Sequence, residues 1–361
     1  MLDMRASPHL PRQLLLGAFL LRHALPSVQD DHRRLPATVS RLDRRYAGAG
    51  SRRDRTRGTL HARRARLERA CHDEQNQRVG MSIKSDILSY FEGHRGVDVS
   101  GQELAEALGV SRNAIWKAVE TLRADGYAVD SGTNRGYRFA EENDILSAEG
   151  IRCALGTQLP DVDIIVYDEI DSTNNEAKRM LSSGYAGEAL LVANSQTAGR
   201  GRRGRSFESP AGGLYMTLVL QEGAIAGEPT NVTMAAAVAV SHALADLCRI
   251  EPAIKWVNDV LVDGLKVCGI LSEGTSDLET GSMQNVAVGI GVNLGPAVFS
   301  KELDGIAGAV ALADGNTRNE FAAHVACELK QLVADDAMIA KMIAEYKRLL
   351  IAPVPEGAFS A

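Results

Sequence analysis

Seven consecutive residues, Gly-Arg-Gly-Arg-Arg-Gly-Arg at 199–205, combine three glycines with four arginines. Four guanidinium groups so close together cannot enter an apolar core, because each buried charge would need its own partner. The segment must therefore lie at the surface, and it follows an apolar run at 189–194 that is typical of a strand. Glycine lets a ligand approach the backbone closely, and arginine pairs with phosphate and carboxylate groups. The run predicts a loop that wraps a nucleotide and a carboxylate together.

The four arginines also repel one another, which bears on the motion of the loop. We expect the loop to be mobile without an anion and to close when one binds. Exposed strips rich in arginine and glycine also bind nucleic acid, and composition alone does not separate the two interpretations. Other motifs in the chain must decide between them.

The first 80 residues differ in composition from the rest of the chain. They contain seventeen arginines, eight acidic residues and no lysine, whereas the whole chain carries a formal charge of -6. A short apolar stretch at 14–21 is followed by arginine clusters and no periodic apolar face. We expect residues 1–80 to be disordered or a non-native extension, with Met81 as the natural start; a basic arm that binds nucleic acid is the alternative.

Cysteine usage and hydropathy indicate the compartment. The five cysteines form neither a Cys-x-x-Cys pair nor a metal-ligand cluster, which favours buried thiols in a reducing cytoplasm and predicts no fixed metal site. The chain has no run of about 18 or more apolar residues, so we expect no membrane span. The sequence thus predicts a cytoplasmic protein.

Residues 81–141 predict a winged helix-turn-helix that binds DNA. Three helices are indicated by an apolar face over 84–91, a capping box that begins at Ser100, and an apolar stripe that begins at Ile115. A glycine-bounded tip at 132–136 completes the pattern as a wing. Short strands are expected on either side of this tip, at 127–129 and 137–139.

The candidate DNA contacts lie on the free face of the third helix and at the tip of the wing. They are Arg112, Asn113, Trp116, Lys117 and Arg135. Arg112 and Asn113 could read base edges, whereas Lys117 and Arg135 would contact phosphates. A small helical domain that docks on another protein would use the same core, so helix spacing, caps and wing together favour DNA.

Residues 142–350 predict an α+β domain with a mixed sheet, because strand-like runs alternate with amphipathic helices. Strands are expected at 164–167, 189–194, 214–220, 254–256, 267–271 and 286–292. Helices are expected at 174–183, at 230–248 and as a pair within 318–350. Asp263-Gly264 is expected to turn a hairpin between Leu261 and Lys266. Residues 351–361, with two prolines, predict an irregular tail.

Five motifs occur in order along the second module. They are Asp-Ser-Thr-Asn at 171–174, Ser-Gln-Thr-Ala at 195–198 just before the arginine-rich run, Lys-Trp-Val-Asn-Asp at 255–259, Lys-Val-Cys-Gly-Ile-Leu at 266–271 and Gly-Ile-Gly-Val-Asn-Leu at 289–294. Together they resemble the biotin–protein ligase family, in its bifunctional ligase/repressor form, over about residues 84–350. The resemblance implies a class II synthetase-like catalytic domain. It also implies a C-terminal SH3-like domain, which is expected to be missing here.

The resemblance implies a reaction in two steps. The carboxylate of biotin attacks the α-phosphate of ATP, with Mg²⁺, and forms biotinyl-5'-AMP and pyrophosphate. A lysine of the biotin carboxyl carrier protein of a carboxylase then attacks this mixed anhydride. Operator DNA is implied as a second partner, and a homodimer is implied when the adenylate is bound.

The family motifs also imply roles for individual residues. Biotin would be bound by Ser172, Thr173, Asn174, Gln196, Gly199, Arg200, Arg202 and Lys266. ATP and the adenylate would be bound by Arg203, Arg205, Phe207, Asn258 and Asn293, with Gly289 also shaping the adenine end. Arg202, Lys266 and Asp259 would be catalytic, with Lys266 offsetting charge on the carboxylate or acyl phosphate, and Asp259 assisting Mg²⁺ or orienting the lysine amine.

Structural alternatives remain for three of these assignments. Ser172 or Thr173 could cap the following helix, and both roles could hold at once. Lys266 could be an exposed hairpin lysine, and the glycines near Gly289 could merely permit close packing of a strand.

Two substitutions and the short tail depart from the family pattern. Phe207 stands where the family commonly has a tryptophan that stacks on adenine, and Val257 replaces the usual proline. The missing C-terminal domain motivates a second hypothesis, a regulator that senses biotinyl adenylate with little or no ligase activity. A lipoate or octanoate ligase of related fold is a third hypothesis, against which the arginine-rich run argues.

Overall fold

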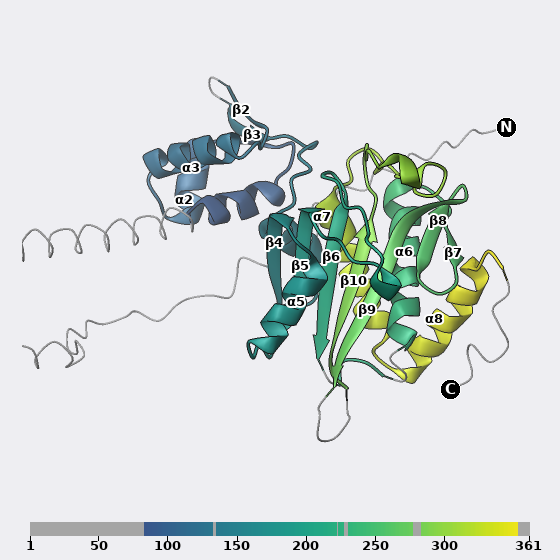
Figure 1. The fold of residues 1–361 in the computed structure, drawn as a ribbon. Coiled ribbons are helices and arrows are strands. Elements are labelled where there is room, and N and C mark those ends of the chain that lie inside the picture. The colour runs from purple at the N-terminus through teal and green to yellow at the C-terminus, as the bar shows by residue number, and fades with distance from the viewer. Residues whose placement is uncertain (1–82, 133–134, 222, 227–229, 277–282, 353–361) are drawn as a thin grey trace, which may run out of the picture. The chain divides into compact units, whose positions relative to one another are not determined.

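The computed structural model describes residues 83–132, 135–221, 223–226, 230–276 and 283–352 (Figure 1). The expected N-terminal extension, two residues at the tip of the wing, and most of the expected tail lie outside the described residues. The described chain contains both modules that the sequence predicts.

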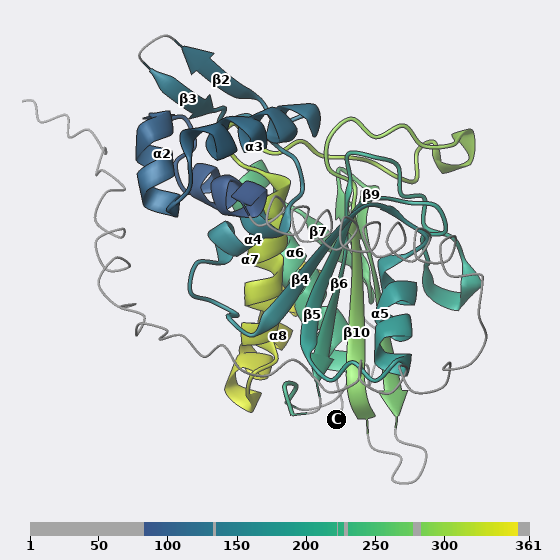
Figure 2. The ribbon, with the colours of Figure 1, turned by 90° about the vertical axis from the view of Figure 1, so that its left-hand side faces the viewer.

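The N-terminal module is a winged helix-turn-helix, as predicted. A helix over residues 83–92 is followed by β1 (Asp98–Val99), α2 (Gly101–Leu108), α3 (Arg112–Ala124), β2 (Val129–Gly132) and β3 (Gly136–Phe139). The three strands pair antiparallel in the order β1-β3-β2. Figure 2 shows the β2–β3 hairpin extending beside α3.

Side-chain caps fix the ends of the two helices that form the turn. The hydroxyl of Ser100 accepts a hydrogen bond from the amide of Glu103 at 3.0 Å, and that of Ser111 accepts one from the amide of Ala114 at 3.2 Å. Gly109, at φ 65°, ends α2 in the left-handed conformation that glycine adopts without strain. The predicted apolar stripe of α3 is fully buried; its members are Ile115, Val119 and Leu122.

The second module is built on a seven-stranded mixed sheet. Its strand order is β4-β5-β6-β10-β9-β8-β7, in which β4 pairs with β5 in parallel and the other neighbours pair antiparallel. The strands are β4 (Val162–Ile170), β5 (Glu188–Gln196), β6 (Leu214–Gln221), β7 (Ala253–Lys255), β8 (Asp259–Val262), β9 (Leu265–Ser276) and β10 (Met283–Val292).

Helices cover the two faces of this sheet unequally (Figures 1 and 2). One face carries α5 (Thr173–Ser182), where Ala177 packs on Ala189, Leu191, Val219 and Ala287. On the other face lie α4 (Ala148–Leu155), α6 (Thr230–Cys248), α7 (Arg318–Leu332) and α8 (Asp336–Leu349). The thicker helical layer encloses the large core, so the thinly covered α5 face is the one left accessible to ligands.

Helix α6 is largely apolar, because it is the central helix of the thick layer. By length and composition alone its segment Asn231–Cys248 could span a membrane, although it contains polar residues. In the structure 67% of this segment is buried, and α6 packs between the sheet and helices α7 and α8. Its composition is accounted for by this packing.

The predicted elements of the second module are confirmed, with shifted ends. Each strand expected from the sequence overlaps an observed one, and the helix expected at 174–183 runs from Thr173 to Ser182. Asp263 and Gly264 turn the β8–β9 hairpin at φ 51° and 79°, as predicted. The predicted hairpin already implied β8 before its turn, whereas α4 and β1, both short, were missed.

Candidate functional site

A narrow cavity opens on the α5 face of the sheet, beneath the loop that follows β5. It is lined by Ser172, Thr173, Asn174, Gln196, Arg200, Phe207, Met216, Gly269, Leu271, Gly289, Ile290 and Gly291. The structure therefore brings together seven of the residues predicted to form the biotin or nucleotide site, Gly289 among them. The lining on β6, β9 and β10 was mostly not predicted.

Three glycines make room for the side chains over this sheet. A Cβ atom on Gly289 would lie 1.9 Å from Oδ1 of Asn174, and one on Gly291 would lie 2.6 Å from the Phe207 ring. Gly269 is paired with Gly291 across β9 and β10, and its Cβ would lie 2.9 Å from the same ring. Gly289 and Gly291 thus permit close packing, as the alternative for this strand held, and both also line the cavity.

Neutral polar groups at the start of α5 form a continuous hydrogen-bond network. The amide of Thr173 donates to Oε1 of Gln196 at 2.8 Å, and Nε2 of Gln196 donates to the hydroxyl of Ser209 at 3.0 Å. The hydroxyl of Thr217, on β6, lies 2.8 Å from both the Thr173 hydroxyl and Oδ1 of Asn174. Thr217 was missed, although a threonine within the apolar run 214–220 was a usable signal.

Ser172 occupies the N-cap position of α5, yet its hydroxyl makes no capping hydrogen bond there. The capping alternative is therefore wrong for this hydroxyl. Ser172 is 2% exposed and lines the cavity. Its hydroxyl is thus placed to bond a ligand rather than the helix.

The arginine-rich run folds into a tight turn. The amide of Gly201 donates to the carbonyl of Arg205 at 2.8 Å, and the amide of Phe207 donates to the carbonyl of Gly199 at 2.9 Å. Arg203 adopts a left-handed φ of 55° within the turn. A Cβ on Gly199 would lie 2.3 Å from the Phe207 carbonyl oxygen, so close backbone approach requires glycine there. Closure of this loop on a ligand stays a prediction.

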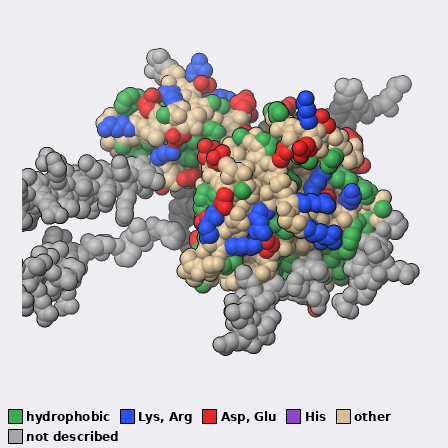
Figure 3. Space-filling view, in the orientation of Figure 1, with side chains coloured by type: hydrophobic (Ala, Val, Ile, Leu, Met, Phe, Trp, Pro, Cys, Tyr) green, Lys and Arg blue, Asp and Glu red, His purple; other side chains and the backbone are tan. Residues whose placement is uncertain are grey.

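Arg200 and Arg202 of the turn form hydrogen bonds with different parts of the domain. Arg200 donates to Oδ1 of Asn175 and to Oε2 of Glu273, each at 3.3 Å. Arg202 donates to Oδ1 of Asn258 at 3.0 Å. The other two arginines of the run are exposed. Figure 3 shows lysine and arginine side chains gathered on the face that carries α5, which favours anionic ligands there.

Lys266 is paired rather than free. Its ammonium lies 2.6 Å from Oδ1 of Asp259 and 5.8 Å from the centroid of the Phe207 ring. The alternative of a simple exposed hairpin lysine is therefore wrong. Together with Asn258, these two residues form a charged group beside the neutral cavity, and Phe207 lies between the two regions.

Asn293 lies away from the cavity lining. It is 3% exposed, and its side-chain amide donates to the carbonyl of Gly308 at 2.9 Å. In this structure Asn293 fixes the loop after β10 to the sheet.

Glu273 and Lys178 extend the site and were not predicted. Oε1 of Glu273 lies 2.7 Å from the Lys178 ammonium, and Oε2 accepts a hydrogen bond from Asn174 at 3.1 Å. Burial alone would raise the pKa of Glu273, but hydrogen bonds from Lys178 and Asn174 and the charge of Arg200 lower it overall. Alternation along β9 was the missed signal, because residues 269, 271 and 273 share one face.

The predicted DNA contacts gather around a groove of the winged helix. Arg112, Asn113 and Trp116 on α3 line this groove together with Gly132 and Tyr137 of the wing. Trp116 is 52% exposed, which is unusual for so large an apolar side chain. Lys117 and Arg135 are exposed as well, outside the groove lining.

Comparisons with known proteins agree with both modules. Residues 166–293 match the model of the biotin/lipoate A/B protein ligase family, and residues 84–138 match that of an HTH domain. The bifunctional ligase/repressor BirA of Bacillus subtilis is 35% identical over 237 residues, which cover 65% of this chain and 72% of that protein. The biotin–[acetyl-CoA-carboxylase] ligase of Paracoccus denitrificans is 48% identical over 131 residues, or 35% of this chain and 52% of that protein.

Among solved structures, this chain matches the biotin protein ligase from Aquifex aeolicus in complex with biotin and ATP. That structure has a TM-score of 0.43 and 25% identity, and the similar region covers 52% of this chain and 78% of that chain.

The fold and the site define a ligase-type α+β domain that follows a DNA-binding module. The chain belongs to the biotin/lipoate A/B protein ligase family, together with the bifunctional ligase/repressors.

Proposed function

We propose that this protein is an ATP-dependent biotin–protein ligase that also binds operator DNA in response to biotin. One observation carries the ligase assignment: a neutral hydrogen-bonding cavity and a cationic turn meet on one face of the sheet. Biotin has the matching chemistry, with a neutral ureido head and a carboxylate tail. The ligase/repressor relatives support the same activity.

The neutral end of the site suits the ureido group. Ser172, Thr173 and Gln196 offer hydroxyl and amide groups, which bond a neutral polar ligand without requiring a counter-charge. Asn174 and Gly199 would complete this end, the former by its amide and the latter by close backbone approach. The hydrogen bond that joins Gln196 to Thr173, and those that join Thr173 and Asn174 through Thr217, hold Thr173, Asn174 and Gln196 in place before the ligand arrives.

The charged end suits a carboxylate and a phosphate held together. Arg200, Arg202 and Lys266 would neutralise the two anions, so that a carboxylate oxygen attacks the α-phosphorus. The new P–O bond forms as the bond to the β-phosphate breaks, and pyrophosphate leaves. Mg²⁺ would enter with ATP, held mainly by phosphate oxygens and water.

The nucleotide would lie along the outer part of the turn. Arg203, Arg205 and Asn258 would contact its phosphates or ribose, and Phe207 would stack on adenine over less area than a tryptophan. Asn293 would contribute by fixing the loop after β10.

In the second step the acceptor lysine of a carboxylase carrier protein attacks the acyl carbon. The acyl–oxygen bond breaks, AMP leaves with its electrons, and the amine loses a proton. Lys266 would stabilise the oxygen on which charge develops, and Asp259 holds that ammonium in place and would orient the amine.

The DNA-binding assignment rests on the winged helix. Arg112 and Asn113 would read base edges from α3, Trp116 would pack in the groove, and Lys117 and Arg135 would contact phosphates. The protein would form a homodimer when the adenylate is bound, and would act in the cytoplasm.

The test is an incubation with biotin, ATP labelled in the α-phosphate, and an apo-carrier fragment. We expect labelled biotinyl-AMP and a biotinylated carrier, retention of both by Arg348→Ala on α8, and a strong loss in Arg202→Gly. Formation of the adenylate without a biotinylated carrier would favour the sensor hypothesis. The absence of both products would contradict the ligase assignment. Competition by lipoate as effective as that by biotin would favour the lipoate hypothesis.

A further inference from the structure

Asn143, in the segment that joins the two modules, is bonded to the winged helix. Its Oδ1 accepts a hydrogen bond from the amide of Ala128 at 2.7 Å, and its Nδ2 donates to the carbonyls of Ala128 and Ala140 at 2.9 and 3.1 Å. Arg95 donates to the carbonyl of Asn143 at 2.8 Å. Because Asn143 is 6% exposed and well bonded, this residue has little freedom to move relative to the winged helix.

The next residue, Asp144, is bonded instead to the first residue of α7. The amide and Nε of Arg318 donate to the two carboxylate oxygens of Asp144 at 2.7 and 2.8 Å, and NH2 donates to the Asp144 carbonyl at 2.6 Å. The side chain of Arg318 is 11% exposed. Charge-assisted bonds of this geometry are short and strongly oriented.

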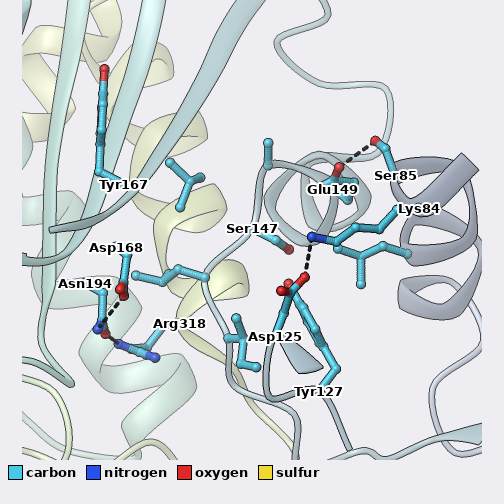
Figure 4. Close-up of a pocket in the computed structure, with 15 residues that line it drawn as sticks. Lys84, Ser85, Asp125, Tyr127, Ser147, Glu149, Tyr167, Asp168, Asn194 and Arg318 are labelled. Atoms are coloured by element: carbon cyan, nitrogen blue, oxygen red, sulfur yellow. Dashed lines mark hydrogen bonds and ion pairs between the residues drawn. The ribbon is translucent and has the colours of Figure 1, made fainter. Parts of the chain in front are cut away.

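The same guanidinium is bonded to the sheet of the second module, on the face covered by α7. NH1 of Arg318 donates to Oδ1 of Asn194 at 2.7 Å, as Figure 4 shows, and to the carbonyl of Gly213 at 3.0 Å. Oδ1 of Asn194 also accepts a hydrogen bond from the amide of Gly212 at 3.3 Å. Asn194 lies two residues before Gln196, so Arg318 contacts the strand that enters the arginine-rich loop and the glycines at which that loop ends.

The joining segment is therefore held by hydrogen bonds to both modules and is not a flexible linker. We call the bonds of Asn143 to the winged helix and of Asp144 to Arg318 the bracket. Beyond Asp144, Asn319 donates to the carbonyl of Ile145 at 3.0 Å and accepts from the amide of Ser147 at 3.1 Å. A flexible linker would leave such groups to water and would let each module move alone. Here consecutive residues are fixed to different modules, so a displacement of one is transmitted to the other.

We propose that Arg318 is a positioning residue that couples ligand binding at the arginine-rich loop to DNA binding, through Asp144 and Asn143. This inference rests on the proposed function, of which it specifies the regulation. A ligand that orders the loop fixes Asn194 and Gly213, and thereby the arrangement in which Arg318 holds Asp144. Thermodynamic linkage makes the effect reciprocal, so bound DNA raises the affinity for the ligand by the same factor.

The experiment measures how much biotin plus ATP tightens binding to a duplex that the wild-type protein selects from a random-sequence library. Asp144→Asn and Asn143→Ala break the two halves of the bracket without altering the cavity. Arg152→Met is the matched control, because its guanidinium also donates to backbone carbonyls, those of Leu159 and Val162, but not to the joining segment. The ratio of affinities with and without ligand cancels changes in the intrinsic affinity for DNA.

We expect the wild-type protein and Arg152→Met to bind DNA about 5- to 150-fold more tightly with ligand, the usual range of allosteric coupling. In Asp144→Asn and Asn143→Ala the ratio of DNA affinities with and without ligand should fall to about 2 or less. The kcat and KM for biotinylation should change less than about threefold. If either variant fails to fold, which thermal unfolding reveals, the other half of the bracket carries the test.

Undiminished coupling in a folded variant would overturn the proposal. The proposal would also fail if the DNA affinity of the wild-type protein did not change when biotin and ATP were added. An equal loss of coupling in Arg152→Met would mean that general destabilisation causes the loss, and this would also overturn the proposal. Failure of the ligase assignment is separate, because it shows as a carrier that stays unbiotinylated.

Discussion

The ammonium nitrogen of Lys266 lies 2.6 Å from Oδ1 of Asp259, on the neighbouring strand. This pairing places a cation next to the Phe207 ring, at the border of the neutral cavity and the cationic turn. A flexible lysine would otherwise sample many rotamers, so Asp259 reduces the entropy lost when the ammonium contacts an oxyanion.

Replacement of Lys266 should slow both half-reactions. Lys266→Met keeps the aliphatic volume but removes the charge, and loss of one such electrostatic contact costs on the order of 10²- to 10³-fold in rate. Pyrophosphate release would follow the first step, and transfer from purified biotinyl-AMP the second. Lys255→Met, at an exposed position on β7, is the control and should behave as the wild type. A rate within about threefold of the control would exclude a catalytic role for Lys266.

The glycines under Phe207 predict a defined steric penalty. In Gly291→Ala the new methyl would lie 2.6 Å from the ring, so we expect a loss of about 1–3 kcal/mol in the free energy of unfolding, together with weaker biotin binding. Gly93→Ala is the control, since its methyl would meet only two carbonyl oxygens, at the ordinary contact distances of 3.6 and 3.8 Å. Urea unfolding and calorimetry measure the two effects.

The cause of the penalty can be tested separately by removing the ring. Adding Phe207→Ala to Gly291→Ala should restore much of the stability, because the clash is then absent. If the double variant is as unstable as the sum of the two single losses, the ring is not the group that the methyl meets.

Local signals in the sequence predicted much of the fold. Ser100 and Ser111 cap helices as expected, and α6 has its predicted bounds of Thr230 and Cys248. These features depend on neighbours within a few residues, which spacing along the chain can report. The eight-residue α4 was missed although Ser147 caps it, whereas α2, of the same length, was predicted from the capping-box pattern that begins at Ser100.

Many residues of the candidate site were predicted from the sequence, but their hydrogen-bond partners were not. Family motifs named Gln196, Asn174 and Arg200, yet their partners Ser209, Thr217 and Glu273 lie 13, 43 and 73 residues away in the sequence. Spacing cannot report such contacts, because they depend on which strands become neighbours in the folded sheet. The sequence interpretation also assigned Asn293 to the nucleotide, whereas its side chain bonds the loop after β10.

The winged helix predicts a separable effect on DNA binding. The double variant Arg112→Ala with Lys117→Ala should weaken binding to the selected duplex while biotinylation stays near normal. Loss of the phosphate contact of Lys117 should also reduce the slope of log affinity against log salt by about 1. The control is Lys84→Ala on the first helix, whose ammonium pairs with Asp125. Equal losses of DNA binding and ligation would contradict the separation into modules.

His242, on α6, predicts a dependence of stability on alkaline pH. Its two ring nitrogens bond Glu328 of α7 and Glu345 of α8, the latter at 3.1 Å, and Glu328 also bonds His324 at 3.2 Å. The hydrogen bond with Glu328 raises the pKa of His242 from 6.5 to about 9, against the lowering effect of burial and with further help from Glu345. The imidazolium therefore clamps three helices over most of the physiological range.

Because the folded pKa of His242 lies above the unfolded value, its stabilising contribution is complete below about pH 6.5 and is lost as the pH rises through about 9. The wild-type Tm should therefore fall between these pH values, and His242→Gln should flatten that part of the profile while lowering the Tm at pH 6.5. His94→Gln is the control, since that ring bonds the carbonyl of Tyr90 rather than a carboxylate. Scanning calorimetry at a series of pH values decides the matter: parallel wild-type and His242→Gln profiles would mean that the three helices are held by packing alone.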